Sequence, residues 1–208
     1  MNWHFFQPLI EELLNQGVPS QTIAGLLLFP LITLLIAGSR YLIGIRGLGM
    51  FFPAVLAVIF LNLGLANGLI LFFLVLIVVT LGRILTLKLH LHYLARMSLL
   101  IWLVSLGIFL SLFWVNNPLF PLLVLILLGE NLVEVQITKG RKEAFKLVLE
   151  TLILSFISFF LLSLETLQNL VLSQPEIFLI LTALGNIFLG RFTGLRLLEY
   201  KRFSRLLK

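Results

Sequence analysis

Residues 69–87 read LILFFLVLIVVTLGRILTL, a helix-length run in which Arg83 is the only charged residue. An apolar run of about 18 residues or more is long enough to cross the hydrocarbon core of a bilayer as a helix. Six further apolar segments accompany this one, so the sequence predicts an all-α integral membrane protein, a bundle of seven transmembrane helices. The predicted spans are residues 21–37, 50–65, 69–87, 98–115, 118–128 and beyond, 147–164, and 177–197.

The composition of the 208-residue chain agrees with a membrane protein. Hydrophobic residues make up 60% and charged residues 12%, and the mean hydropathy is +1.13. A soluble domain is about 45–50% apolar and about 25% charged, so this chain has too little polar surface to cover a soluble globule. The chain has no Cys, which excludes disulfides, thiolate metal sites and cysteine nucleophiles. All nine acidic residues are Glu, which removes Asp-rich magnesium sites.

The charge distribution predicts the orientation of the bundle. The net charge of +6 indicates positive-inside topology rather than nucleic-acid binding, because Lys and Arg gather on the cytoplasmic side of membrane proteins. With seven spans and an external N-terminus, all fifteen Lys and Arg fall on internal segments or at the inner ends of spans. The charged residues of the outer segments are then all acidic: Glu11, Glu12, Glu165 and Glu176.

The N-terminal residues 1–17 contain no Lys or Arg, unlike the positive start of a signal peptide. Phe6, Ile10 and Leu13 recur at helical spacing with Glu11 on the other side, which predicts a short amphipathic helix in the membrane interface, anchored by Trp3. We therefore divide the chain into an external interfacial helix (1–17), a seven-helix membrane domain (18–200) and a basic cytoplasmic tail (201–208).

Charged residues within or near spans are costly and are therefore the candidate functional residues. Glu130 and Glu134 lie four residues apart, so they share one face of the fifth span if that helix continues. Glu150 has Thr151 beside it. We predict an Arg/Glu cluster at the cytoplasmic end of the bundle, and its members are Arg40, Arg46, Arg83, Glu130, Glu134, Glu150, Arg191, Arg196 and Glu199.

Two interpretations of this cluster remain open. The residues either tie helix ends together and extend toward water, or they form a pocket for an anion or peptide, for which Arg is suited. No other constellation indicates catalysis, a metal or a cofactor. His90 and His92 form an isolated pair without a third ligand, and no span offers a His as a base for a serine nucleophile.

Several stretches resemble a known family. They are residues 40–44 (RYLIG), 47–57 (GLGMFFPAVLA), Pro175 with Glu176, and 190–203 (GRFTGLRLLEYKRF). Together they resemble the bacterial seven-transmembrane domain usually fused to an inactive transglutaminase-like domain. Two features depart from that pattern: residues 1–17 are too few for such a domain, and Gly129-Glu130-Asn131-Leu132 replaces an acidic–Arg–Phe run.

The resemblance implies a bacterial cytoplasmic membrane protein that works beside ATP-grasp peptide ligases and retropepsin-like proteins, in peptide ligation or tagging. The first hypothesis is thus a non-enzymatic bundle that anchors a cytoplasmic ligase-type partner, or an external transglutaminase-like or protease-like protein. The alternative is a transporter or exporter of a small anionic or peptide-like substrate, for which Pro30 and Pro53 could break helices around a site. A membrane-embedded enzyme is a third hypothesis, which only the Arg/Glu cluster favours.

Overall fold

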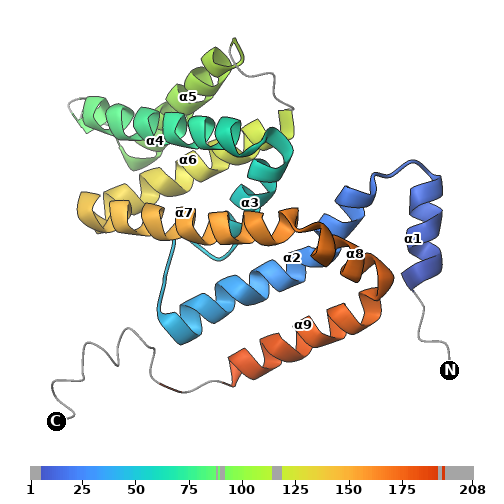
Figure 1. Cartoon of the computed structure of the whole chain (residues 1–208). Helices are drawn as coiled ribbons and strands as arrows, with labels where there is room; N and C mark the ends of the chain where they lie inside the picture. The colour runs from blue at the N-terminus through green and yellow to red at the C-terminus, as the bar shows by residue number, and fades with distance from the viewer. Residues whose placement is uncertain (1–5, 88, 90–91, 114–118, 192–193, 195–208) are drawn as a thin grey trace.

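A computed structural model describes residues 6–87, 89, 92–113, 119–191 and 194. All regular structure in these ranges is helical (Figure 1). The elements in chain order are α1 (Phe6–Asn15), α2 (Ser20–Gly38), the π-helical turn η1 (Ser39–Ile43), α3 (Phe51–Leu63), α4 (Leu65–Leu87), α5 (Tyr93–Ser111), α6 (Leu119–Lys139), α7 (Arg141–Ser163), α8 (Glu165–Ser173) and α9 (Pro175–Gly190).

Each of the seven predicted apolar segments corresponds to one helix, namely α2, α3, α4, α5, α6, α7 and α9. By length and composition, four described stretches can each cross a bilayer: α2 with η1, α4, α5 and α7. The pair α8 and α9, bent by 104°, makes a fifth candidate. The 13 residues of α3 extend only about 20 Å at 1.5 Å per residue, whereas the hydrocarbon core is about 30 Å thick.

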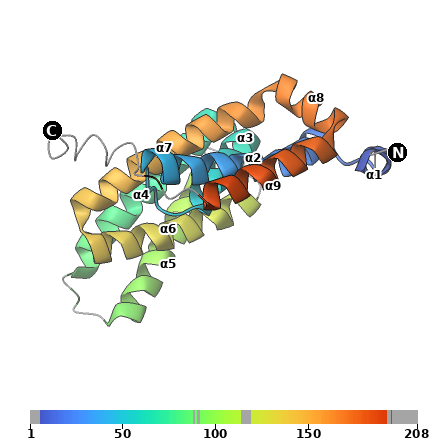
Figure 2. The same cartoon turned by 90° about the horizontal axis from the view of Figure 1, so that it is seen from below.

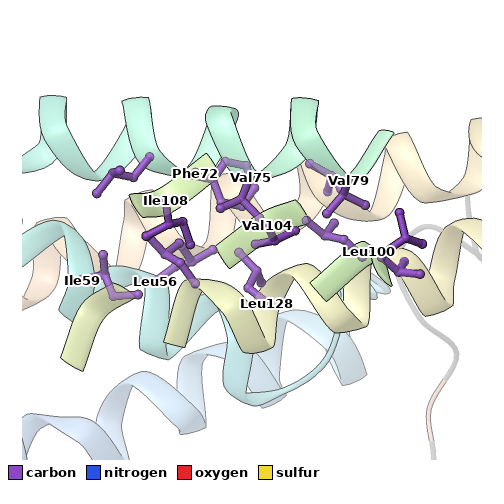
Figure 3. Close-up of a cluster of buried hydrophobic side chains, with 14 of the residues drawn as sticks. Leu56, Ile59, Phe72, Val75, Val79, Leu100, Val104, Ile108 and Leu128 are labelled. Atoms are coloured by element: carbon purple, nitrogen blue, oxygen red, sulfur yellow. The ribbon is translucent and has the colours of Figure 1, made fainter. Parts of the chain in front are cut away.

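The larger core lies between α3, α4, α5 and α6. Figure 3 shows its side chains meeting from all four helices, with Leu56 from α3, Val75 from α4, Val104 from α5 and Leu128 from α6. Each of these four residues is nearly or fully buried. Gly82 of α4 faces α5, where a Cβ on the glycine would lie 2.8 Å from the Leu100 side chain. The small residue therefore allows the two helices to approach closely.

A second core joins α2, α3, α7 and α8. Leu28 and Ile32 of α2 meet Ala54 and Ala57 of α3 and Leu154 of α7. In both views α2 lies between α7 and α9 (Figures 1 and 2). Since α3 and α7 contribute to both cores, this pair holds the two halves of the bundle together.

Large apolar side chains also cover the outside of the bundle. Leu26 of α2 is 72% exposed, Phe109 of α5 62% and Phe188 of α9 72%. In water such a surface would be an extensive aggregation site, whereas in a bilayer it faces lipid tails. The surface therefore supports the multi-pass membrane protein that the composition predicts.

The predicted amphipathic N-terminal helix is present as α1, which lies beside the corner between α8 and α9 (Figure 2). The backbone N–H of Phe6 donates to Glu176 Oε1 at 2.7 Å, and Gln7 Nε2 donates to the Ser173 carbonyl at 3.0 Å. Leu9, Leu13 and other apolar residues of α1 stay exposed, as expected of a helix that lies in an interface. The predicted anchor Trp3 is outside the described residues.

Candidate functional site

The region between α2 and α3 begins with an unusual helix end. In the π-helical turn η1, the N–H groups of Gly44 and Ile45 both donate to the Ser39 carbonyl, at 2.9 and 3.3 Å. Gly44 then adopts φ +100°, a left-handed conformation that glycine tolerates best. The chain thereby leaves α2 and enters residues 44–49, which we call the basic turn. Because these residues are not helical, their N–H groups need acceptors from elsewhere in the protein.

Two neighbouring side chains of α7 supply these acceptors. Glu150 Oε2 accepts the N–H groups of Arg46 and Gly47, at 2.8 and 3.0 Å. Thr151 Oγ1 accepts the N–H of Leu48 at 2.7 Å, and its own hydroxyl donates to the Leu147 carbonyl at 2.7 Å. Three consecutive backbone N–H groups are thus bound by two consecutive side chains. This arrangement fixes the basic turn against α7.

Arg40 completes the contacts of the basic turn from the α2 side. Its guanidinium donates through Nη2 to the carbonyl of Arg46, the residue whose N–H is bound by Glu150. The Nε atom of Arg40 is buried and has no hydrogen-bond partner within the described ranges. The backbone of Arg46 is therefore held on both sides, while its side chain is exposed.

The charge of Glu150 is partly balanced by Lys146. Lys146 Nζ lies 3.8 Å from Glu150 Oε1, one turn earlier on α7. The lysine side chain is 73% exposed and the glutamate side chain 15%. The carboxylate therefore faces the basic turn from inside the protein, while the ammonium group extends toward solvent.

Three of the nine predicted cluster residues, Arg40, Arg46 and Glu150, meet in this network. Arg83 is half-buried near the end of α4; α6 continues through Glu130, which is half-buried, and Glu134, which is exposed. Arg191 is exposed at the end of α9, a helix that packs on α2, α8 and α1. Arg196, Glu199, His90 and the tail 201–208 are outside the described residues.

The structure also shows polar contacts that sequence reasoning missed. Gln136 of α6 is buried, and its Nε2 donates to Thr80 Oγ1 of α4 at 3.1 Å. The sequence signal for this contact is a glutamine that stands between the apolar residues Val135 and Ile137. The link lies between two helices of the larger core and does not join the basic turn.

Cationic residues are concentrated at one end of the bundle, whereas glutamates occur at both ends. The left end of the bundle in Figure 1 is formed by η1, the ends of α4 and α6 and the starts of α5 and α7. The right end is formed by α1, α8 and the start of α9. The Lys and Arg residues of the described ranges belong to elements at the left end or follow the end of α9. They are Arg40, Arg46, Arg83, Arg96, Lys139, Arg141, Lys142, Lys146 and Arg191. Glu11, Glu12, Glu165 and Glu176 belong to the right-hand elements.

Within the described ranges, no group of three or more His, Cys, Asp or Glu side chains is arranged to hold a metal ion. The arrangement that is present can fix a backbone turn and display cationic side chains at one end of the bundle.

Comparison with known proteins agrees with this architecture. Neither the curated proteins nor the solved structures include a significant match to the chain. A family model described as seven transmembrane helices usually fused to an inactive transglutaminase matches residues 11–207. That range contains the helices α2 to α9, the basic turn and its Glu150 contact. Since the match covers nearly the whole sequence, this chain belongs to the family of seven-transmembrane domains usually fused to an inactive transglutaminase.

Proposed function

We propose that this protein is a non-enzymatic membrane anchor that holds a cytoplasmic partner protein against the basic end of its bundle. The main support for this proposal is the basic turn: Glu150 and Thr151 fix its backbone, while the Arg46 side chain is exposed. A fixed turn loses little conformational entropy when its side chains bind, which favours recognition. The family, whose seven-helix domain is usually fused to an inactive transglutaminase, agrees with a non-catalytic role.

The basic end of the bundle is the surface we assign to the partner. We define it by the exposed cationic side chains Arg46, Lys139, Lys142, Lys146 and Arg191. Positive residues mark the cytoplasmic side of membrane proteins, so we place this end in the bacterial cytoplasm and α1 outside, with seven spans. A partner with an acidic surface complements the basic end, and such complementarity speeds association and selects the partner. The peptide ligases that the family resemblance implies are the class of partner we propose.

Cross-linked purification from native membranes tests this function. Because Arg46 contacts the rest of the protein through its backbone, its side chain can be changed with little effect on the turn. We expect wild type and Arg46→Lys to retain the same cytoplasmic protein, and the double variant Arg46→Glu with Lys142→Glu to lose it. Capture should also weaken as salt rises, since exposed charges are screened.

The outcomes of this experiment separate the proposal from its main alternative. The anchoring function is contradicted if wild type captures no specific partner. It is also contradicted if the double variant, present in the membrane at the wild-type level, captures the partner equally well. Uptake of an anionic solute by proteoliposomes that contain only this protein would instead identify a transporter.

A further inference from the structure

A groove of about 590 Å³ opens between α2 and α3 in the half of the bundle that includes the start of α2. Its volume lies within the range of about 300–1,000 Å³ that is typical of small-molecule sites. One wall is α2 from Gln21 to Phe29, and the other is α3 from Val55 to Asn62; Leu162 of α7 also lines the groove. Eight residues of helix correspond to about 12 Å, so the groove is much shorter than a membrane span of about 30 Å.

The groove changes in polarity along its length. The end near the start of α2 is lined by Gln21, Thr22 and Asn62, which are exposed and uncharged. Asn62 uses its amide N–H for its own helix, donating to the Val58 carbonyl at 2.9 Å, so its side-chain oxygen is the group available to a ligand. The opposite end is apolar and ends at Phe29 and Val55.

A glycine gives the groove its depth. Gly25 lines the groove, and a Cβ placed on it would have no neighbouring atom within 4 Å. Its neighbour in the lining, Leu26, is 72% exposed. An apolar surface that contacts nothing forfeits dispersion attraction, so in a bilayer the space beside Gly25 favours entry of a flexible hydrocarbon chain.

We propose that this groove binds one acyl chain of a membrane phospholipid, with the ester region of the lipid at Gln21, Thr22 and Asn62. The inference rests on the membrane arrangement proposed above, in which α1 lies in the interface directly before α2 begins. That position places the polar end of the groove at the boundary between headgroups and tails, where the esters of a phospholipid lie. A partner's spanning helix fits less well, because the groove is less than half the length of a span and has a polar end.

Photo-cross-linking tests this assignment. The full-length protein is reconstituted into phosphatidylcholine vesicles that contain a phosphatidylcholine with a diazirine in one acyl chain, and labelled peptides are identified by mass spectrometry. We expect labelling concentrated on residues 21–29 and 55–62. Gly25→Leu, which fills the groove, should reduce this labelling several-fold, to the level of the outer face of α5.

A matched control and a second variant make the test decisive. Gly190→Leu also adds a side chain where nothing lies within 4 Å, but at the end of α9 and outside the groove, so it should leave labelling of residues 21–29 unchanged. Val58→Phe fills the groove from the opposite wall and should act like Gly25→Leu. Labelling spread evenly over all exposed helices, or unchanged in both groove variants, overturns the proposal.

The same experiment distinguishes a protein occupant from a lipid. Because the chain has no Cys, a single Leu26→Cys variant reports neighbours of the groove without background. Efficient disulfide formation between two copies at this position, together with little lipid labelling, would overturn the lipid assignment in favour of self-association. Loss of the proposed cytoplasmic partner would leave the lipid labelling unaffected, so the two proposals fail separately.

Discussion

At the scale of single residues, the structure assigns Glu150 a role that its position in a span could not reveal. The carboxylate binds two backbone N–H groups that are 104 and 103 residues away in the sequence. Reasoning from spacing could flag Glu150 as a costly charge near a span, but could not identify partners so distant along the chain. The cost is offset here by charge-assisted hydrogen bonds to a non-helical turn.

Removing this carboxylate should destabilise the protein. We expect Glu150→Ala to lower the free energy of unfolding by about 2–3 kcal/mol, because it leaves two N–H groups without an acceptor. Glu150→Gln keeps a neutral acceptor and should cost roughly half as much. Thermal unfolding in mild detergent, followed by circular dichroism, measures both changes.

Lys146→Ala is the control for this pair. It removes the 3.8 Å ion pair but leaves the turn contacts intact, and an ion pair whose lysine is largely exposed contributes only about 0–1 kcal/mol. A larger effect for Lys146→Ala than for Glu150→Ala would show that charge balance, rather than the backbone contacts, stabilises this region.

Gly47 in the basic turn provides a second residue-scale prediction. It has φ +57°, and a Cβ on it would lie 3.3 Å from Thr151 Oγ1. Gly47→Ala should therefore cost about 1–2 kcal/mol of left-handed strain and in addition weaken the Thr151 contact to Leu48. Gly17→Ala, at φ +86° with open space around it, isolates the strain term. Equal losses in unfolding free energy for the two variants would contradict a role for the close approach to Thr151.

At the scale of elements, the apolar segments were predictable and the short polar helix was not. Seven hydrophobic runs predicted helices because their length and composition leave few alternatives. The hydrophobic pattern does not predict the nine-residue α8, because residues 165–176 have too few apolar residues to form a span. Its signals were the spacing of Leu167, Leu170 and Val171 and the proline that begins α9. The candidate cluster was identified by residue type, but only the packing of α7 on the basic turn shows which members meet.

The crossing of α4 and α5 depends on small residues. A Cβ on Gly82 would lie 2.8 Å from the Leu100 side chain and 2.9 Å from Leu103. We expect Gly82→Leu to separate the helices and to lower the unfolding free energy by about 1–3 kcal/mol through overpacking. Gly190→Leu, which has open space, should have little effect in the same thermal-unfolding measurement. Comparable losses for the two variants would rule out close helix packing as the cause.

At the scale of the whole molecule, the basic turn explains how a short helix can belong to a spanning bundle. α3 extends about 20 Å, so in the proposed seven-span arrangement residues that are not helical would cover the remaining depth. Glu150 lies nine residues after the start of α7 at Arg141, which is about 13 Å along that helix. The basic turn therefore contacts α7 well inside its length, where Glu150 and Thr151 replace the hydrogen bonds that water would provide. In the seven-span arrangement proposed above, α3 and the part of the turn that follows Arg46 would make one span, with the Arg46 side chain extending to the cytoplasmic surface.

The seven-span arrangement is tested most directly by the accessibility of single cysteines to a membrane-impermeant maleimide in intact cells. Because the chain has no Cys, the introduced cysteine is the only thiol in this chain that can react with the maleimide. With seven spans, a cysteine that replaces Asn15, Asn67 or Gln174 should react in intact cells. A cysteine that replaces Lys139 or Arg191 should react only after the membrane is permeabilised. Asn67, just after α3, is the critical position. If Cys at Asn67 is protected while Cys at Asn15 reacts, α3 does not complete a span and the seven-span account is wrong.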